Sequence, residues 1–503
     1  MDSLPSHTAT QHQPQPAPVM PPMSLSRLEA LPTEIISDIA SKLHTEDVLA
    51  LRLTSKTAED KTFGGFSRFY FRKKQFMLTP DSLQCLVDIS NHPKLRTVLQ
   101  HVILSLDKYD LDDAAFGFNP DADDSVSRAR YIAYRRGYKE QALLVTTGRD
   151  HELLAQAFAN LPNLDTVGIR DYNSELGWRG QEGGRWRAYG AATAPHLTGL
   201  DLLSRTVSPG HQFASRVFTT VLRALGTAGA TPNNFEVILR STERSLHDSA
   251  FYIPSYLEPT VAPVLQGLRS LLLTVEVAFS STQRHVIRHV APSDAFDSLS
   301  GFLLLAPNIT HIRFNSAPAH RRHNTTSTVQ FWKWLGAAHP DDNPFLPNLE
   351  QLDFGMMQIP SPDFVFTAVT RFGGSLKKIN FRTLLLEVHD EVIEDDGRPN
   401  LWVQLLARLP ALAPGLESVV VSQMSQRLRY RRRTERARVG FRGGAYPSGV
   451  VTYTVTHMRD AQQWRRTLEE GLEVQWSRPD PSDPTSQWGQ LTPDLESSDS
   501  DSE

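Results

Sequence analysis

The chain of 503 residues contains a single cysteine, Cys85. One thiol cannot build an internal disulfide framework or a cysteine-rich zinc site, so both kinds of stabilisation are excluded. No run of 18 apolar residues occurs, so we expect no membrane-spanning segment and no membrane partner. An excess of one charge is also missing. The formal net charge of −4 argues against nucleic acid or an anionic membrane as the main partner of the whole chain.

Sequence signatures of catalysis are missing as well. We find no phosphate-binding glycine-rich loop with a following lysine, no nucleophile elbow and no His-Glu-x-x-His motif. The acidic stretch 121–124 lacks the glycine that a calcium loop requires, because Val126 stands at that position. His320 and His323 have no carboxylate or cysteine near them in sequence, which favours a solvated loop over a metal site. We therefore expect a protein that is not an enzyme and that holds no cofactor or metal.

The two ends of the chain differ in composition from its middle. Residues 1–23 are rich in proline, glutamine and histidine and have no apolar core typical of a secretion signal. Residues 477–503 are acidic and poor in large apolar residues. Both segments are predicted to be disordered, since neither can bury enough apolar surface to offset its ordering entropy. The expected location is cytoplasmic, nuclear or both. The length of the chain predicts a small module followed by a larger body.

Residues 28–56 are the most informative stretch of the chain. Leu31, Ile35, Ile39 and Leu43 recur every four residues, which predicts one apolar face on a helix. A second short helix should follow, with its own aliphatic residues. Two short helices cannot bury this many large aliphatics against each other, so a partner protein is expected to cover the excess.

This stretch resembles an F-box over residues 24–68. The matching motif elements are Leu31-Pro32, Glu34, Asp47, Leu51-Arg52 and Ser55-Lys56. The resemblance implies that the chain docks on a Skp adaptor and, through it, on a cullin. The sequence does not sort the residues that face the adaptor from those that pack within the hairpin. The residues carried over to the adaptor face are Leu31, Pro32, Ile35, Ile39, Leu43, Val48, Leu51 and Leu53.

Residues 69–476 are expected to form a helical connector and then a repeat array. A proline or glycine turn precedes an aliphatic residue, and further apolar residues follow three and five positions later. An amphipathic helical stretch precedes most copies. The predicted strands are 164–169, 197–202, 268–273, 309–314, 349–354, 376–381 and 416–421, with a partial copy at 93–98 and a degraded one at 235–239.

This pattern resembles an irregular leucine-rich repeat, as in many fungal F-box proteins of this size. The implied fold class is α/β: a helical F-box followed by an irregular leucine-rich-repeat-like solenoid with short parallel strands. The units are uneven and mostly lack the asparagine or cysteine of the family pattern. The alternative is a non-repetitive α/β domain whose strands share a turn. Two insertions interrupt the array, at 106–138 and 172–190.

Two stretches are candidates for binding a target protein. The glycine-rich loop 172–190 carries Trp178, Arg185 and Trp186, residue types that are frequent in binding hot spots, although both rings could instead form a structural lid. The run 427–442 holds eight arginines, among them Arg431, Arg432 and Arg433. This run could localise the chain to the nucleus, hold nucleic acid, or clamp an acidic or phosphorylated target. It could equally be a solvated face that pairs with the acidic end or with the acidic run 387–396.

Taken together, the sequence predicts a substrate-recognition adaptor subunit of a Skp–cullin–F-box ubiquitin ligase. The F-box would bind the Skp adaptor, and the repeat array would bind a protein target whose identity the sequence does not reveal. Two alternatives remain open. One is an F-box scaffold acting outside a ligase, and the other is a nucleic-acid-associated repeat protein.

Overall fold

The computed structural model describes residues 28–110, 125–172, 188–199, 202, 211–240, 245–277, 296–316, 328–337, 346–389, 399–430, 433–442 and 449–476. The chain divides into two compact units, Met1–Phe66 and Ser67–Glu503. The predicted disorder of residues 1–23 and 477–503 lies outside the described residues. Among the described residues, no helix is both long and apolar enough to cross a membrane.

The first unit is built from helices α1 (Thr33–Lys42), α2 (Thr45–Thr54) and the start of α3 (Lys56–Phe71). Lys61 of α3 donates hydrogen bonds of 2.6 Å to the carbonyls of Glu29 and Leu31, which ties the N-terminal turn to α3. Arg52 of α2 lies 3.9 Å from the ring centre of Phe66, a cation–π contact. Polar contacts therefore hold α3 both to the N-terminal turn and to α2.

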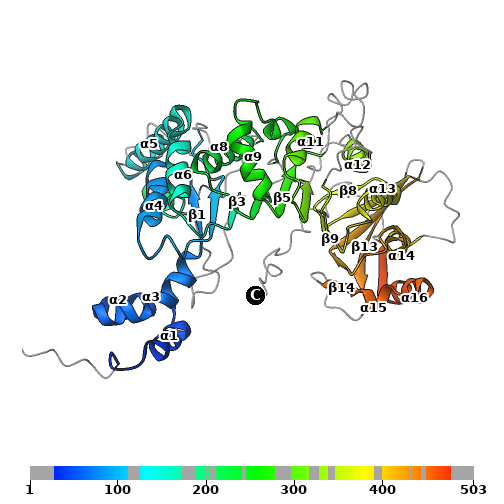
Figure 1. Cartoon of the computed structure of the whole chain (residues 1–503), viewed down its shortest axis with the longest axis horizontal. Coiled ribbons are helices and arrows are strands. Elements are labelled where there is room, and N and C mark those ends of the chain that lie inside the picture. Colours follow the sequence, from blue (N-terminus) through cyan, green and yellow to red (C-terminus); the bar gives the residue numbers. More distant parts are fainter. Residues whose placement is uncertain are drawn as a thin grey trace, which may run out of the picture. The chain divides into compact units, whose positions relative to one another are not determined.

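The second unit is organised around a ten-stranded sheet (Figure 1). All neighbouring strands in it pair in parallel except the last pair, β11 and β14, which is antiparallel. In spatial order the strands are β1 (Lys73–Met77), β2 (His101–Ser105), β3 (Thr166–Arg170), β4 (Asn234–Ile238), β5 (Ser270–Val275), β6 (His311–Ser316), β7 (Gln351–Gly355), β9 (Lys378–Arg382), β11 (Ser418–Ser422) and β14 (Val450–Thr454).

Helices connect the strands, and successive helices pack against one another along one side of the sheet (Figure 1). This succession of helix, turn and parallel strand is a solenoid-like α/β fold. The helices are α4 (Pro80–Asn91), α5 (Ser125–Thr147), α6 (Arg149–Ala159), α7 (Ala194–Thr198), α8 (His211–Ala228), η3 (Asp248–Phe251), α9 (Glu258–Gly267), α11 (Asp297–Leu304), α12 (Val329–Gly336), α13 (Pro362–Phe372), α14 (Leu401–Leu412), α15 (Val455–Met458) and α16 (Ala461–Gly471).

The turn before each strand explains the proline–asparagine pattern of the sequence. The carbonyl oxygen of the residue preceding a strand accepts two consecutive amides from the next repeat. For example, Arg269 accepts from Thr310 at 2.9 Å and from His311 at 3.0 Å. The turn asparagines add a second link, since Asn348 donates to the Pro307 carbonyl at 3.0 Å. The turns thus satisfy one another's backbone groups from repeat to repeat.

The core lies between the sheet and the helices. Alternate strand residues such as Ile312 and Phe314 are fully buried there, as the two-residue period of a strand requires. Aromatic residues of the helices pack on those of the strands: the ring centres of Trp332 and Phe354 are 4.8 Å apart. Trp464 of α16 is also fully buried and donates to the Leu406 carbonyl at 3.0 Å, which fixes α16 on α14.

A second, five-stranded sheet was not predicted. Its order is β15 (Leu472–Trp476), β13 (Arg433–Phe441), β12 (Met424–Tyr430), β10 (Leu385–His389) and β8 (Gln358–Ile359). Strands β8, β10 and β12 follow β7, β9 and β11 after short corners. Each corner contains a non-glycine residue in the left-handed region: Met356 (φ 51°), Thr383 (φ 54°) and Gln423 (φ 49°). Three successive repeats therefore turn from the first sheet into the second at a similarly strained residue.

Most predicted strands are confirmed, with starts about two residues later than the first aliphatic of each copy. The prediction at 197–202 is wrong, because Leu197 lies in the short helix α7 and is exposed. Proline favours the first turn of a helix, and Gly199 (φ 71°) ends α7 in the left-handed conformation. The degraded copy at 235–239 supplies the strand beside β3 instead. The partial copy at 93–98 is a turn, and the expected insertion 106–138 contains the start of α5.

Candidate functional site

The first unit exposes large aliphatic side chains. Ile35 is 49% exposed and Leu53 is 86% exposed, whereas the buried apolar residues among the described part of this unit, 28–66, are Ile36, Val48 and Ala58. A unit with so small a core leaves aliphatic surface for a partner to cover.

The eight residues predicted for the adaptor face divide into three classes. Pro32, Ile35 and Leu53 are exposed; Leu31, Ile39, Leu43 and Leu51 are half-buried; Val48 is buried and packs within the unit. The sequence reading missed Leu49, which is exposed beside the buried Val48. The spacing of a short helix with apolar residues at 48, 49, 51 and 53 does not identify which of them face inward.

The face of the ten-stranded sheet opposite the helices carries a continuous row of polar residues. The register joins one residue from each strand, and every one of the ten is polar. We call this set the polar row: Lys73, His101, Thr166, Asn234, Ser270, His311, Gln351, Lys378, Ser418 and Thr454. Six of them occupy unspecified positions of the predicted copies, so a comparison of those positions across the copies would have revealed part of the row: Thr166, Ser270, His311, Gln351, Lys378 and Ser418.

Two similar clusters of histidine, arginine and carboxylate lie on this face. In the first, Glu236 Oε2 is 3.0 Å from Arg170 Nη2 and 3.6 Å from His101 Nε2. Burial, followed by the charges of Lys73 and Arg170, holds the pKa of His101 well below its ordinary value. Gly168 leaves room for the His101 ring beside β3, because a Cβ at position 168 would lie only 3.3 Å from His101 Nε2.

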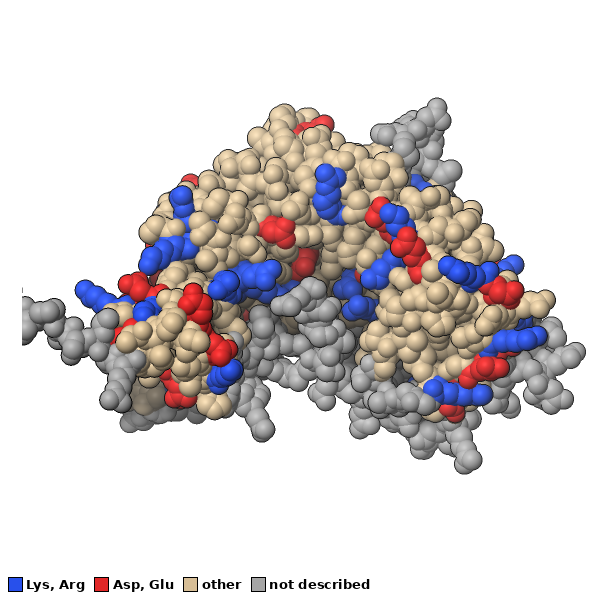
Figure 2. Space-filling model, turned by 60° about the horizontal axis from the view of Figure 1, so that its bottom comes forward, with Lys and Arg blue, Asp and Glu red and all other residues tan. Residues whose placement is uncertain are grey.

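The second cluster joins β6 to β7. Asp353 Oδ2 lies 3.1 Å from His311 Nε2 and 3.4 Å from Arg313 Nε, and Gln351 donates to the other carboxylate oxygen. Both carboxylates of the two clusters are thus engaged by cations of the chain. The face holds charges of both signs, and Figure 2 shows lysine and arginine interspersed with aspartate and glutamate on the side turned forward. Such a surface suits a polar partner surface and not a large apolar ligand.

Of the described arginines of the run, five lie on the antiparallel pair β12 and β13: Arg427, Arg429, Arg433, Arg436 and Arg438. Arg427 Nη1 is 3.2 Å from Glu387 Oε2 of β10, so one arginine pairs with the acidic run 387–396, as one of the alternatives anticipated. Arg433 is the first residue of β13. The remaining predicted target-binding residues, Trp178, Arg185, Trp186, Arg431 and Arg432, lie outside the described residues.

A groove of about 680 Å³ runs along the turns at the amino-terminal edge of β6, β7, β9 and β11. It is bordered by Arg269, Glu350, Lys377 and Glu417. Lys377 Nζ is 2.6 Å from Glu350 Oε1, and both side chains are about half exposed. The groove therefore has mixed, partly neutralised charge and brings together no nucleophile with a base.

Within the described ranges, no group of three or more histidine, cysteine, aspartate or glutamate residues is placed to hold a metal ion. No family model and no curated protein matches the chain. Among solved structures, a chain in the crystal structure of the Rad7 and Elc1 complex in yeast is similar at 9% identity, covering 78% of this chain and 83% of that chain. The TM-score is 0.21, so this likeness carries no argument.

Proposed function

We propose that the chain is the substrate-recognition adaptor of a Skp–cullin–F-box ubiquitin ligase. The observation that carries the proposal is the aliphatic surface of the first unit, above all Ile35 and Leu53, together with the Leu31-Pro32 motif at the start of α1. Leu53 is 86% exposed to water, and its burial by a partner would contribute about 1.5–3 kcal/mol to binding. A Skp adaptor is the partner that the F-box motif implies.

The second unit would hold the target protein in this proposal. In this proposal the parallel sheet of the second unit and its helices are the leucine-rich-repeat-like array. The surface that binds the target consists of the polar row and the two ion clusters on the same face of the sheet. These side chains can form hydrogen bonds and ion pairs with a polar protein surface. The carboxylate of each cluster, Glu236 or Asp353, fixes the positions of the histidine and arginine that it contacts. The chain would contribute proximity and orientation to ubiquitin transfer, not acid–base or nucleophilic chemistry.

The test is co-purification of the full chain with a Skp adaptor and a cullin. The proposal expects both proteins to be recovered in stoichiometric amounts and both to be lost when residues 24–68 are deleted. Recovery of the adaptor without the cullin would instead favour a scaffold outside a ligase. Salt-dependent retention on nucleic acid, with no adaptor recovered, would favour the nucleic-acid alternative.

The target surface needs a separate test, by proximity labelling of target proteins in cells with the proteasome inhibited. Lys378→Glu reverses a charge in the polar row, whereas Lys333→Glu reverses an exposed charge on α12, among the helices. The proposal expects the first change to alter the set of labelled proteins and the second to leave it unchanged. Identical labelling by the two variants would contradict the proposal that the polar row binds the target.

A further inference from the structure

Helix α5 (Ser125–Thr147) is strongly basic although the chain as a whole is slightly acidic. It contains four arginines and one lysine against a single acid, Glu140, and that acid pairs with Arg136 at 2.7 Å. The helix therefore has a net charge of +4 within 23 residues. The predicted insertion 106–138 covers only the first part of this helix, so its charge is not evident from the sequence pattern.

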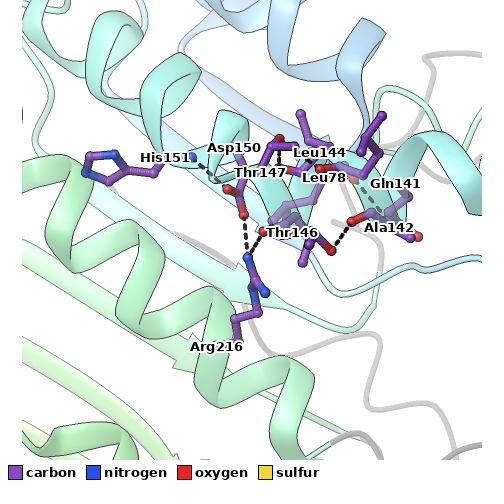
Figure 3. Close-up of polar contacts among 11 residues, drawn as sticks. Leu78, Gln141, Ala142, Leu144, Thr146, Thr147, Asp150, His151 and Arg216 are labelled. Atoms are coloured by element: carbon purple, nitrogen blue, oxygen red, sulfur yellow. Dashed lines mark hydrogen bonds and ion pairs between the residues drawn. The ribbon is translucent and has the colours of Figure 1, made fainter.

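The inner face of α5 is firmly attached to the rest of the unit. Gln141 is buried, donates to the Leu78 carbonyl at 3.0 Å, and accepts from the Tyr109 amide at 2.9 Å. Arg216 of α8 donates to the Val145 carbonyl and lies 3.7 Å from the buried carboxylate of Asp150, so α8 holds both the end of α5 and the start of α6 (Figure 3). The helix is thus held in one orientation.

The outer face of α5 combines cations with exposed aliphatics. Arg128, Ile132, Arg135, Lys139 and Leu143 follow one another at spacings of three and four residues and so share one stripe. Ile132 is 59% exposed and Leu143 is 63% exposed. A hollow of about 340 Å³ lies on this stripe, bordered by Ile132 and Lys139 among others. We call these five residues the basic stripe.

The basic stripe selects its partner by two properties. The cations require negative charge, and the aliphatics require apolar surface to leave water. The phosphates of nucleic acid supply the first requirement but leave Ile132 and Leu143 uncovered. An acidic peptide that also carries aliphatic or aromatic side chains supplies both.

We infer that the basic stripe of α5 is the docking site for residues 477–503 of the same chain. This segment has seven acids and one arginine, a net charge of −6, and its Leu495 is flanked by Asp494 and Glu496. The segment begins directly after β15 and contains 27 residues, so its extended reach is about 90 Å. From β2 to β11 there are seven strand steps, and β15 lies two steps beyond β12, the continuation of β11 in the second sheet, so these nine spacings sum to about 43 Å. The length of the segment therefore allows contact within one molecule.

The experiment uses a fluorescent peptide of residues 477–503 and measures its anisotropy with the full chain and with a chain ending at Trp476. The truncated chain should bind the peptide, and the full chain should bind it at least tenfold more weakly because its own segment occupies the site. High salt should weaken binding to the truncated chain, since exposed charges are screened. Equal affinity of the two chains would overturn the inference.

Matched variants of the truncated chain locate the site. Arg128→Glu with Lys139→Glu should weaken peptide binding about tenfold, whereas Arg438→Glu, an exposed charge in the arginine run on β13, should not. Leu143→Ser should weaken binding, and Leu197→Ser, equally exposed on α7, should not. A loss caused only by Arg438→Glu would move the site to the arginine run and overturn the inference. Tighter binding of an RNA duplex to the basic stripe, with displacement of the peptide, would also overturn it.

Discussion

His311 Nε2 lies 3.1 Å from Asp353 Oδ2, and this contact joins β6 to β7 on the polar face of the sheet. Asp353 is 1% exposed. Burial acts to raise the pKa of this carboxyl, but the hydrogen bond and charge of His311, the charge of Arg313 and the hydrogen bond from Gln351 together hold it below its ordinary value. A carboxyl with a lowered pKa in the folded state adds stability above its unfolded pKa and loses it as pH falls through the folded value.

Replacement of Asp353 by asparagine should therefore destabilise the second unit at neutral pH. The expected loss is about 3 kcal/mol at pH 7, because the Arg313 cation and the hydrogen-bonded His311 lose a buried anionic partner. The loss should be constant from pH 7 to 5 and shrink only below the ordinary carboxyl pKa of about 3.9. Urea unfolding across this range measures it. Glu469→Gln, which breaks an exposed pair with Arg465, is the control and should cost at most about 0.5 kcal/mol. A loss at Asp353 no larger than that of the control would contradict the role given to the cluster.

For Lys74 we expect the opposite effect, a substitution that raises the stability at neutral pH. It occupies a core-facing position of β1, and burial lowers the pKa of its amine to about 8. Between this value and the ordinary 10.5, the unfolded chain binds more protons than the folded chain, so stability should rise with pH. Lys74→Met should abolish that rise. At pH 7 the variant should gain up to about 3 kcal/mol, reduced by the lost cation–π contacts with Phe71 and Tyr189.

The measurement is the free energy of unfolding of both proteins from pH 7 to 10. The wild type should approach the variant as pH rises. Parallel curves would show that the amine of Lys74 is ionised in the folded protein with an ordinary pKa.

The corner residue Met356 provides a test of backbone strain. Its φ of 51° costs a non-glycine residue about 1 kcal/mol, which glycine avoids. Met356→Gly should leave the melting temperature unchanged or raise it, because its half-buried side chain loses little packing. The neighbouring Met357, 4% exposed and packed in the core, is the matched control. Met357→Gly should cost at least about 3 kcal/mol. Similar destabilisation by both substitutions would be inconsistent with strain at the corner.

The repeat pattern predicted the parallel sheet because its spacing reports burial. Ile309, Ile312 and Phe314 are all fully buried, yet only the last two lie in β6. Ile309 is buried in the turn that precedes β6, so the strand begins two residues after the first aliphatic residue of the pattern. The copy at 197–202 has the same spacing, but its first aliphatic residue, Leu197, is exposed. The spacing of residues alone cannot show whether a residue is buried. The second sheet was missed because three of its five strands, β8, β10 and β12, continue directly from strands of the first sheet after a corner of one or two residues.

The candidate sites were less accessible to sequence reasoning. Val48 and Leu49 are adjacent aliphatics on α2, and only the packing of the three helices buries one and exposes the other. The two ion clusters combine residues up to 135 positions apart in sequence, from His101 to Glu236, and the parallel register alone brings them together. The fold is encoded locally in each repeat, whereas these surfaces arise only when the repeats stack.

The most direct test of the account is the affinity of the full chain for a purified Skp adaptor, measured by calorimetry. Ile35→Asp with Leu53→Asp places two charges on the exposed face of the first unit, and Leu197→Asp places one on a comparably exposed leucine of the second. Loss of two hot-spot contacts of about 2 kcal/mol each predicts a fall in affinity of about a thousandfold for the first variant. The Leu197 variant should bind like the wild type. Equal affinity of all three proteins, or no binding by the wild type, would contradict the adaptor assignment.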